Sequence, residues 1–344
     1  MKTKENFNSF DITKFILSIL IIGIHARPFY KLSNIMNTLF SNGICRMAVP
    51  IFFLISGYLL MYRLNITKNK KEYIKNYLKR LIKLYIIWTI IYLPIIITRL
   101  ITNKYGLISD FMIFFRNTIF DGSVTHLWYI KDLAVAIIII CILKRLNLND
   151  KKILAISLSL YLLGIWVDTY YGLLVSIVGK KSIITTIIRI YTKVFVTTRN
   201  GLFFGLIYVF LGMIIYNSKG QKKKINLQKY TLLFLILYII EIFTLSYYTN
   251  MKEFNLYVFL IPLVVCIFNY IVDKKIENRK IDFKLLRNMS TLIYFSHILF
   301  LEILKLVLSN NLILFILVVI LSILFSYIII KLSNKFKFLK KIYS

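Results

Sequence analysis

Long apolar stretches recur along the whole chain, and they constrain its fold more than any other feature of the sequence. About ten of them approach the roughly 20 apolar residues that a helix needs to cross a lipid bilayer. They cover residues 12–30, 46–62, 84–101, 127–143, 153–171, 201–216, 230–248, 254–272, 291–308 and 312–331. Backbone groups in lipid must pair within their own segment, and runs such as Ala136–Leu143 lack the alternation of barrel strands. The pattern therefore predicts an all-α, polytopic transmembrane helical bundle with about ten helices.

The distribution of charge agrees with this prediction and orients the bundle. The chain carries 45 Lys and Arg residues against 14 Asp and Glu residues, a net charge of +31, although 59% of its residues are apolar. With the N-terminus placed inside, the connections on that side hold more than twice as many basic residues as those on the other side. Basic connections face the cytoplasm, so we predict a multi-pass protein of the cell (plasma) membrane with both termini cytoplasmic. No basic block belongs to a polar domain that would recognise nucleic acid.

We predict a single transmembrane domain over residues 1–344, with no soluble domain and a first apolar run that is retained rather than cleaved. Residues 63–83 place apolar side chains at helical spacing among basic ones, which is typical of an interfacial helix. The outer connection 172–200 departs from the charge rule, with five basic residues and no acid. It is interpreted as a re-entrant or amphipathic segment rather than a free loop. The three cysteines have no paired spacing, so we expect neither a disulfide framework nor a metal site.

The chain contains only three histidines, His25, His126 and His297. A charged group in a span costs about 2.5–3.5 kcal/mol, so polar residues there are functional candidates, although a lone histidine more often bonds a neighbouring helix. Lys14 and His25 are eleven residues apart, which places them about 16 Å apart on roughly the same helix face. An imidazole suits proton abstraction from a hydroxyl, and a cation at the inner edge suits a phosphate-bearing donor. His297, about two turns into the span 291–308 from the inner side, is assigned a structural or donor-channel role.

Five motifs follow one another along the chain. They read DITKFILSILIIGIHARPF around Lys14 and His25, AVPIFFLISGYLL over 48–60, FDGSVTHLWYIKDL over 120–133, RNGLFFGLIYVFLGMII over 199–215 and STLIYFSHILF over 290–300. In these motifs and their order, the chain resembles the acyltransferase 3 family of membrane O-acyltransferases over essentially its whole length, with Lys14 where the family has arginine. The third and fourth motifs are similar, more narrowly, to the membrane domain of the membrane-bound serine racemases of vancomycin-resistant bacteria.

The resemblance implies an enzyme that moves an acyl group, usually acetyl, from cytoplasmic acyl-CoA to a hydroxyl of an extracytoplasmic glycan or another cell-envelope acceptor. His25 is then the general base or a transient acyl carrier. Lys14, with Lys79 and Arg80, holds the phosphates of the donor. The substrate-binding candidates on the acceptor side are His126, Trp128, Tyr129, Asp121, Ser56, Arg199 and Asn200. His297 and Glu302 are further candidates.

Simpler roles stay open for several of these residues. Ser56 and its neighbouring glycine allow close approach of two backbones, and Trp128 and Tyr129 fit an aromatic belt at the membrane surface. Asp121 fits a turn, or it orients His126.

Two other functions also stay open. The bundle is alternatively an uptake transporter for serine or another small amino acid, because the membrane domain of the racemases is thought to take up serine. The departure at Lys14 leaves an inactive assembly partner as a third interpretation. Glu302 and Lys305 are three residues apart on one predicted helix, so they are expected to pair with each other.

Overall fold

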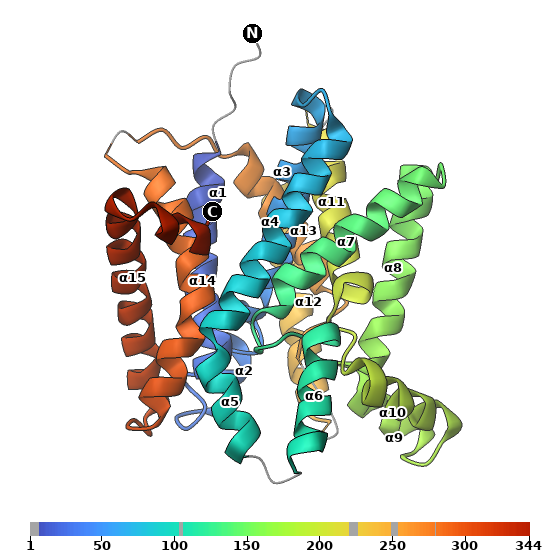
Figure 1. Ribbon diagram of the computed structural model, residues 1–344. Coiled ribbons are helices and arrows are strands. Elements are labelled where there is room, and N and C mark those ends of the chain that lie inside the picture. The colour runs from blue at the N-terminus through green and yellow to red at the C-terminus, as the bar shows by residue number, and fades with distance from the viewer. Residues whose placement is uncertain (1–6, 103–105, 220–225, 249–253, 279) are drawn as a thin grey trace. The chain divides into compact units, whose positions relative to one another are not determined.

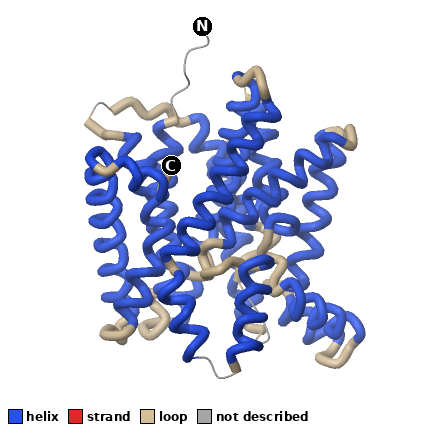
Figure 2. The backbone as a smooth tube through the Cα atoms, in the orientation of Figure 1, coloured by secondary structure: helices blue, strands red, loops and turns tan. Residues whose placement is uncertain are grey.

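The computed structural model describes residues 7–102, 106–219, 226–248, 254–278 and 280–344. All regular elements within these ranges are helical, and Figure 2 shows helices and loops throughout them. The predicted all-α fold is therefore confirmed. The described chain divides into two compact units, each built from segments that are not continuous in the sequence.

The first compact unit combines Met1–Ile55, Gln221–Ile242 and Phe259–Ser344. Its helical elements are α1 (Asn8–Ala26), α2 (Asn34–Phe40), the 3-10 turn η1 (Ile44–Met47), the start of α3 (Ala48–Ile66), most of α12 (Leu227–Ser246), α13 (Leu260–Asp273), α14 (Phe283–Lys305), α15 (Asn311–Lys335) and the 3-10 turn η3 (Lys337–Ile342). Helix α14 packs against both α1 and α15, and Figure 1 shows these helices side by side. Their contact faces bury apolar side chains such as Ile22 and Leu292.

The second compact unit combines Ser56–Gly220 and Phe243–Val258. Its helical elements are the rest of α3, α4 (Lys70–Ile91), α5 (Leu93–Thr102), α6 (Leu107–Phe120), α7 (Trp128–Arg145), α8 (Asp150–Val167), α9 (Tyr171–Val178), α10 (Ile183–Phe195), the π-helical turn η2 (Gly201–Gly205) and α11 (Leu206–Asn217). The turn η2 contacts both α7 and α8 and continues directly into α11. It thereby brings the segment before it against the start of α7.

The prediction of about ten helices is wrong, because the described residues form fifteen α-helices. Helices α4 and α5 meet at a 55° bend, where Pro94 has no N–H to donate to the carbonyl of Ile90. Helices α8 and α9 meet at a 68° bend after the C-cap residue Asp168. The short helices α2, α6 and α10 lie where connections were expected.

The prediction of ten membrane spans is not confirmed. Four described stretches are long and apolar enough to cross a membrane, or up to six if each bent pair forms one span. The four are Asn8–Ala26, Asn34–Ile66, Leu227–Ser246 and Asn311–Lys335. Helix α7 covers a predicted span, but it contains Lys131 and Asp132 within its first turns. The apolar helices nevertheless fit a lipid bilayer.

Two basic connections are largely helical. Most of residues 63–83 belongs to α4, in agreement with the predicted helix. The connection 172–200 contains α9 and α10, so it is not a free loop. Helix α10 buries Ile188 while Ile183 and Ile187 are exposed, so its apolar residues are not all covered by the described chain.

Candidate functional site

Lys14 and His25 both lie on α1, an uninterrupted helix of 19 residues, and both are half-buried. Near its start, α1 is fixed by Asp11, whose two carboxylate oxygens accept hydrogen bonds of 2.8 and 2.6 Å from Arg287 on α14. Beyond its end, Asn311 donates a 3.0 Å hydrogen bond to the carbonyl of Ala26. These contacts set the position of α1 against α14 and α15 on both sides of His25.

His297 lies beside His25, with ring centroids 5.3 Å apart. The prediction that His297 lies only about two turns into its helix is wrong, because the helix begins before the predicted span. Helix α14 begins at Phe283, because Asp282 caps it by accepting the N–H of Leu285 at 2.9 Å, and His297 is about four turns from that start. The longer helix carries His297 to the level of His25 on α1.

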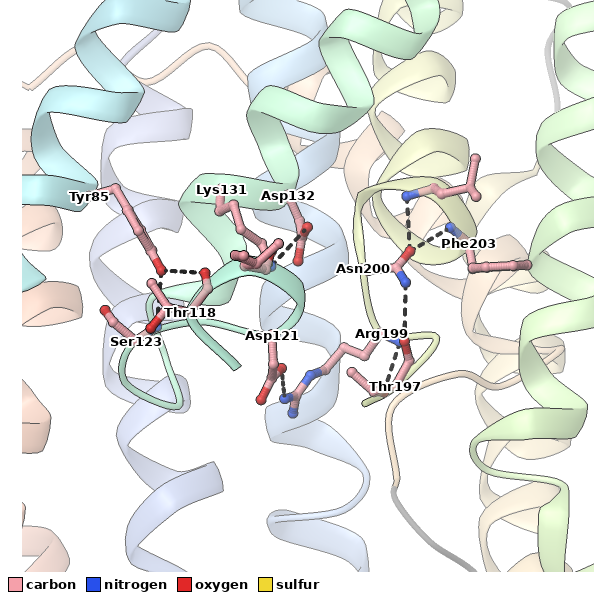
Figure 3. Close-up of polar contacts among 12 residues, drawn as sticks. Tyr85, Thr118, Asp121, Ser123, Lys131, Asp132, Thr197, Arg199, Asn200 and Phe203 are labelled. Carbon is pink, nitrogen blue, oxygen red and sulfur yellow. Dashed lines mark hydrogen bonds and ion pairs between the residues drawn. The ribbon is translucent and has the colours of Figure 1, made fainter. Parts of the chain in front are cut away.

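A charged cluster lies at the start of α7 in the second unit, and we define it as Asp121, Trp128, Lys131, Asp132 and Arg199. Arg199 donates a 2.9 Å hydrogen bond to Asp121 and places its guanidinium 4.9 Å from the centre of the Trp128 ring. Figure 3 shows this pairing below Lys131 and Asp132. Asp121 is therefore tied to Arg199.

Lys131 and Asp132 complete the charged cluster. Lys131 donates a 3.0 Å hydrogen bond to the carbonyl of Ile119, and its Nζ lies 3.7 Å from Oδ1 of Asp132. Asp132 is only 2% exposed, and its Oδ2 accepts no hydrogen bond from the described residues. Burying a carboxylate oxygen that accepts no hydrogen bond costs free energy, and buried polar groups of this kind are enriched at functional sites.

Asn200 stabilises the local backbone in this region. Its Oδ1 accepts hydrogen bonds from the N–H groups of Leu202 and Phe203, both at 3.0 Å, and so caps the π-helical turn η2 (Figure 3). A Cβ atom on Gly201 would lie 2.5 Å from the carbonyl oxygen of Asp132. Only glycine permits this close approach of the turn to α7, so Asn200 and Gly201 together fix Arg199 beside the cluster.

Ser56 and Tyr129 are brought together, with 3.1 Å between their hydroxyl oxygens. The neighbouring Gly57 packs directly on α11, where a Cβ atom would lie 2.0 Å from the carbonyl oxygen of Val209. The close-approach interpretation of this motif therefore accounts for Gly57, whereas Ser56 bonds a predicted site residue.

The aromatic candidates at the start of α7 are buried. Trp128 and Tyr129 are each less than a tenth exposed, and the ring centroids of His126 and Tyr92 lie 5.2 Å apart in an edge-to-face arrangement. These residues therefore line the interior of their unit in this structure. Glu302 belongs to the first unit, and its expected pairing with Lys305 is present at 3.7 Å.

Sequence reasoning missed the Asp11–Arg287 pair and the approach of His297 to His25. A signal for the first was present, because an acid in an apolar opening helix is costly unless it finds a cation. No local pattern indicates the second, since it depends on where two distant helices meet.

The fold and its apolar helices define a helical membrane protein. The chain belongs to the acyltransferase 3 family, whose sequence profile, described as an acyltransferase domain, matches residues 7–331. The resemblance inferred from the five motifs is therefore confirmed.

Curated relatives carry racemase names. Two proteins of Enterococcus faecalis, each called an amino-acid racemase, are 28% identical over 280 residues and 26% identical over 352 residues. These alignments cover 81% and 98% of this chain but 38% and 48% of the relatives. A serine/alanine racemase of Enterococcus gallinarum is 28% identical over 263 residues, 74% of this chain and 35% of that protein. The chain thus spans less than half the length of these relatives, and no solved structure matches it.

Proposed function

We propose that this chain is a membrane O-acyltransferase that moves an acyl group, acetyl by family resemblance, from cytoplasmic acyl-CoA to a hydroxyl of an extracytoplasmic glycan or another cell-envelope acceptor. The observation that carries the proposal is the family match over residues 7–331. Family membership supports an acyltransferase-type enzyme in general. The donor, the acyl group and the acceptor are the parts that we add.

His25 is the proposed general base. A hydroxyl becomes an effective nucleophile when a base removes its proton as it attacks, and an imidazole does this near neutral pH. The acceptor oxygen forms a bond to the thioester carbonyl carbon while His25 takes its proton. The carbon–sulfur bond then breaks, and the departing thiolate of CoA recovers that proton from His25. The products are an ester and a free thiol, and the imidazole returns to its neutral form.

The donor phosphates are assigned to basic residues. Lys14 lies on the same helix as His25, and Lys79 and Arg80 are exposed on α4. Ammonium and guanidinium groups form strong charge-assisted hydrogen bonds with phosphate oxygens. Lys14 supplies charge without the planar fork of arginine, so its contact with a phosphate is less directional.

The acceptor is assigned to the start of α7. Trp128 and Tyr129 supply buried aromatic rings there, and Arg199 and Asn200 lie on the segment that packs against them. Ser56 adds a hydroxyl beside Tyr129. The proposed topology follows the charge of the connections, with both termini in the cytoplasm and a multi-pass chain in the plasma membrane.

The test is the acyl-ester content of envelope polymers, measured by mass spectrometry. A deletion strain is complemented with the wild type, His25→Ala, or Cys141→Ser as a matched control at a residue outside the proposed machinery. We expect esters with the wild type and the control, and a fall of about 100-fold or more with His25→Ala. Equal membrane levels of the three proteins are verified by immunoblot. Unchanged esters in the deletion strain would overturn the proposal.

A second candidate function rests on the relatives. Their names indicate amino acids as substrates, and this chain matches only part of their length. An uptake transporter for serine or a similar small amino acid fits that observation. Uptake of radiolabelled serine into proteoliposomes separates the two functions, because the acyltransferase proposal predicts none.

A further inference from the structure

The His25 and His297 rings are spaced as in a hydrogen-bonded pair of imidazoles. Their centroids are 5.3 Å apart and their planes differ by 42°. An N–H···N hydrogen bond of about 2.9 Å places two imidazole centroids roughly 5 Å apart, because each nitrogen lies about 1.1 Å from its ring centre. A centroid separation of 5.3 Å therefore leaves room for such a bond when the His25 ring is turned toward His297.

The backbone of α14 fixes which nitrogen of His297 carries a proton. Its Nδ1 lies 2.7 Å from the carbonyl oxygen of Tyr294 and 3.2 Å from that of Ile293. A carbonyl oxygen only accepts, so Nδ1 is the donor and the lone pair of the neutral ring is on Nε2. The His297 side chain is fully buried, at 0% exposure.

The backbone of α1 near His25 is also held by packing against Cys45. Gly23, two residues earlier, is packed so tightly that a Cβ atom there would lie 2.7 Å from Sγ of Cys45. Together with the Asp11–Arg287 and Ala26–Asn311 contacts, this packing leaves α1 little freedom to move His25 away from His297.

We propose that His297 is the positioning residue for His25: its Nε2 accepts the N–H of His25, selects the tautomer of that ring and stabilises the imidazolium formed during acyl transfer. The other nitrogen of His25 is then left with the lone pair that takes the proton of the acceptor hydroxyl. The proton stays on His25 until the thiolate of CoA recovers it, and His297 remains neutral. A base held by a second group in this way is the general arrangement of catalytic triads. The inference rests on the proposed role of His25 as the base.

Two amide substitutions separate this role from packing. His297→Gln keeps an acceptor near the position of Nε2, whereas His297→Asn keeps only a donor near Nδ1. We measure initial CoA release from acetyl-CoA by proteoliposomes supplied with envelope polymer from the deletion strain. We expect His297→Asn to lose roughly 10- to 100-fold in kcat, as for one charge-assisted hydrogen bond, with an unchanged KM for acetyl-CoA. His297→Gln should recover most of that loss. Equal losses in both variants would overturn the proposal.

A spectroscopic measurement tests the pairing without relying on catalysis. The chain has three histidines, so ¹⁵N-histidine labelling gives few signals, and His126→Asn removes one of them for assignment. We expect His297 to carry its proton on Nδ1, and the His25 signals to change in His297→Asn but not in His126→Asn. Unaltered His25 signals in His297→Asn would overturn the pairing. If His25→Ala keeps full acyl transfer while the wild type shows the pairing, the proposed role of His25 as the base fails and the hydrogen bond stands.

Discussion

Two buried aspartates of the second unit, Asp168 and Asp132, show how differently this fold treats the same group. Each is 2% exposed. Asp168 accepts hydrogen bonds from the hydroxyls of Thr169 at 3.0 Å and Thr197 at 3.3 Å, and from the backbone and side-chain nitrogens of Asn255, both at 3.4 Å. Asp132 has an ammonium 3.7 Å from one oxygen and no hydrogen bond from the described residues to the other.

The comparison separates a structural acid from a candidate functional one. Asp168 ties together the end of α8, Thr197 and the chain at Asn255, so its burial is offset by the bonds that it accepts. Asp132 lies where the proposed acceptor site is, and the fold leaves one of its oxygens available. Burial alone does not distinguish the two; the donors around each carboxylate do.

The largest expected effect is on Asp168. Asp168→Asn replaces a carboxylate oxygen with an amide group that cannot accept, so buried donors lose a charged partner. We expect a loss of about 3 kcal/mol in the free energy of unfolding, measured by denaturant titration in micelles. Asp150→Asn, at an exposed acid on the same α8, is the control and should change little. A loss below about 1 kcal/mol at Asp168 would remove the distinction.

An intermediate effect is expected for Arg199→Gln, which removes both the ion pair with Asp121 and the contact with Trp128. These groups are only partly exposed, so we expect a loss of about 1–2 kcal/mol in the same titration. Arg189→Gln, on the exposed surface of α10, is the matched control. A double-mutant cycle with Asp121→Asn isolates the ion pair, and zero coupling would show that the pair adds no stability.

The smallest expected effect is at Asp132. Asp132→Asn keeps the volume of the side chain, and the altered group has no described hydrogen-bond donor to lose at Oδ2. We expect the free energy of unfolding to stay within about 1 kcal/mol of the wild type. A loss equal to that of Asp168→Asn would make Asp132 a structural acid as well, and the contrast between the two would fail.

Sequence periodicity and motif order were sufficient for the fold class, the family and the placement of Lys14 and His25 on one helix. They failed to predict the start of α14, where charged residues belong to the helix. Residues 283–290, which include Lys284 and Arg287, were left outside the predicted span 291–308, yet Asp282 starts α14 before them, and this moved His297 by about two turns. The bend beside Pro94 was readable in principle, since proline interrupts helices. The partners of Asp121 and His25 were not, because they depend on tertiary packing.

The extended chain at residues 255–257 has a consequence for biosynthesis. Its backbone is satisfied by side chains made much earlier: Tyr161 exchanges hydrogen bonds of 2.8 and 3.0 Å with Tyr257, and Thr169 accepts the N–H of Leu256 at 3.0 Å. Unpaired backbone is not tolerated in lipid, so this stretch needs Tyr161 and Thr169 to be in place when it enters its site. The second unit therefore becomes complete only after residues 255–257 have been synthesised.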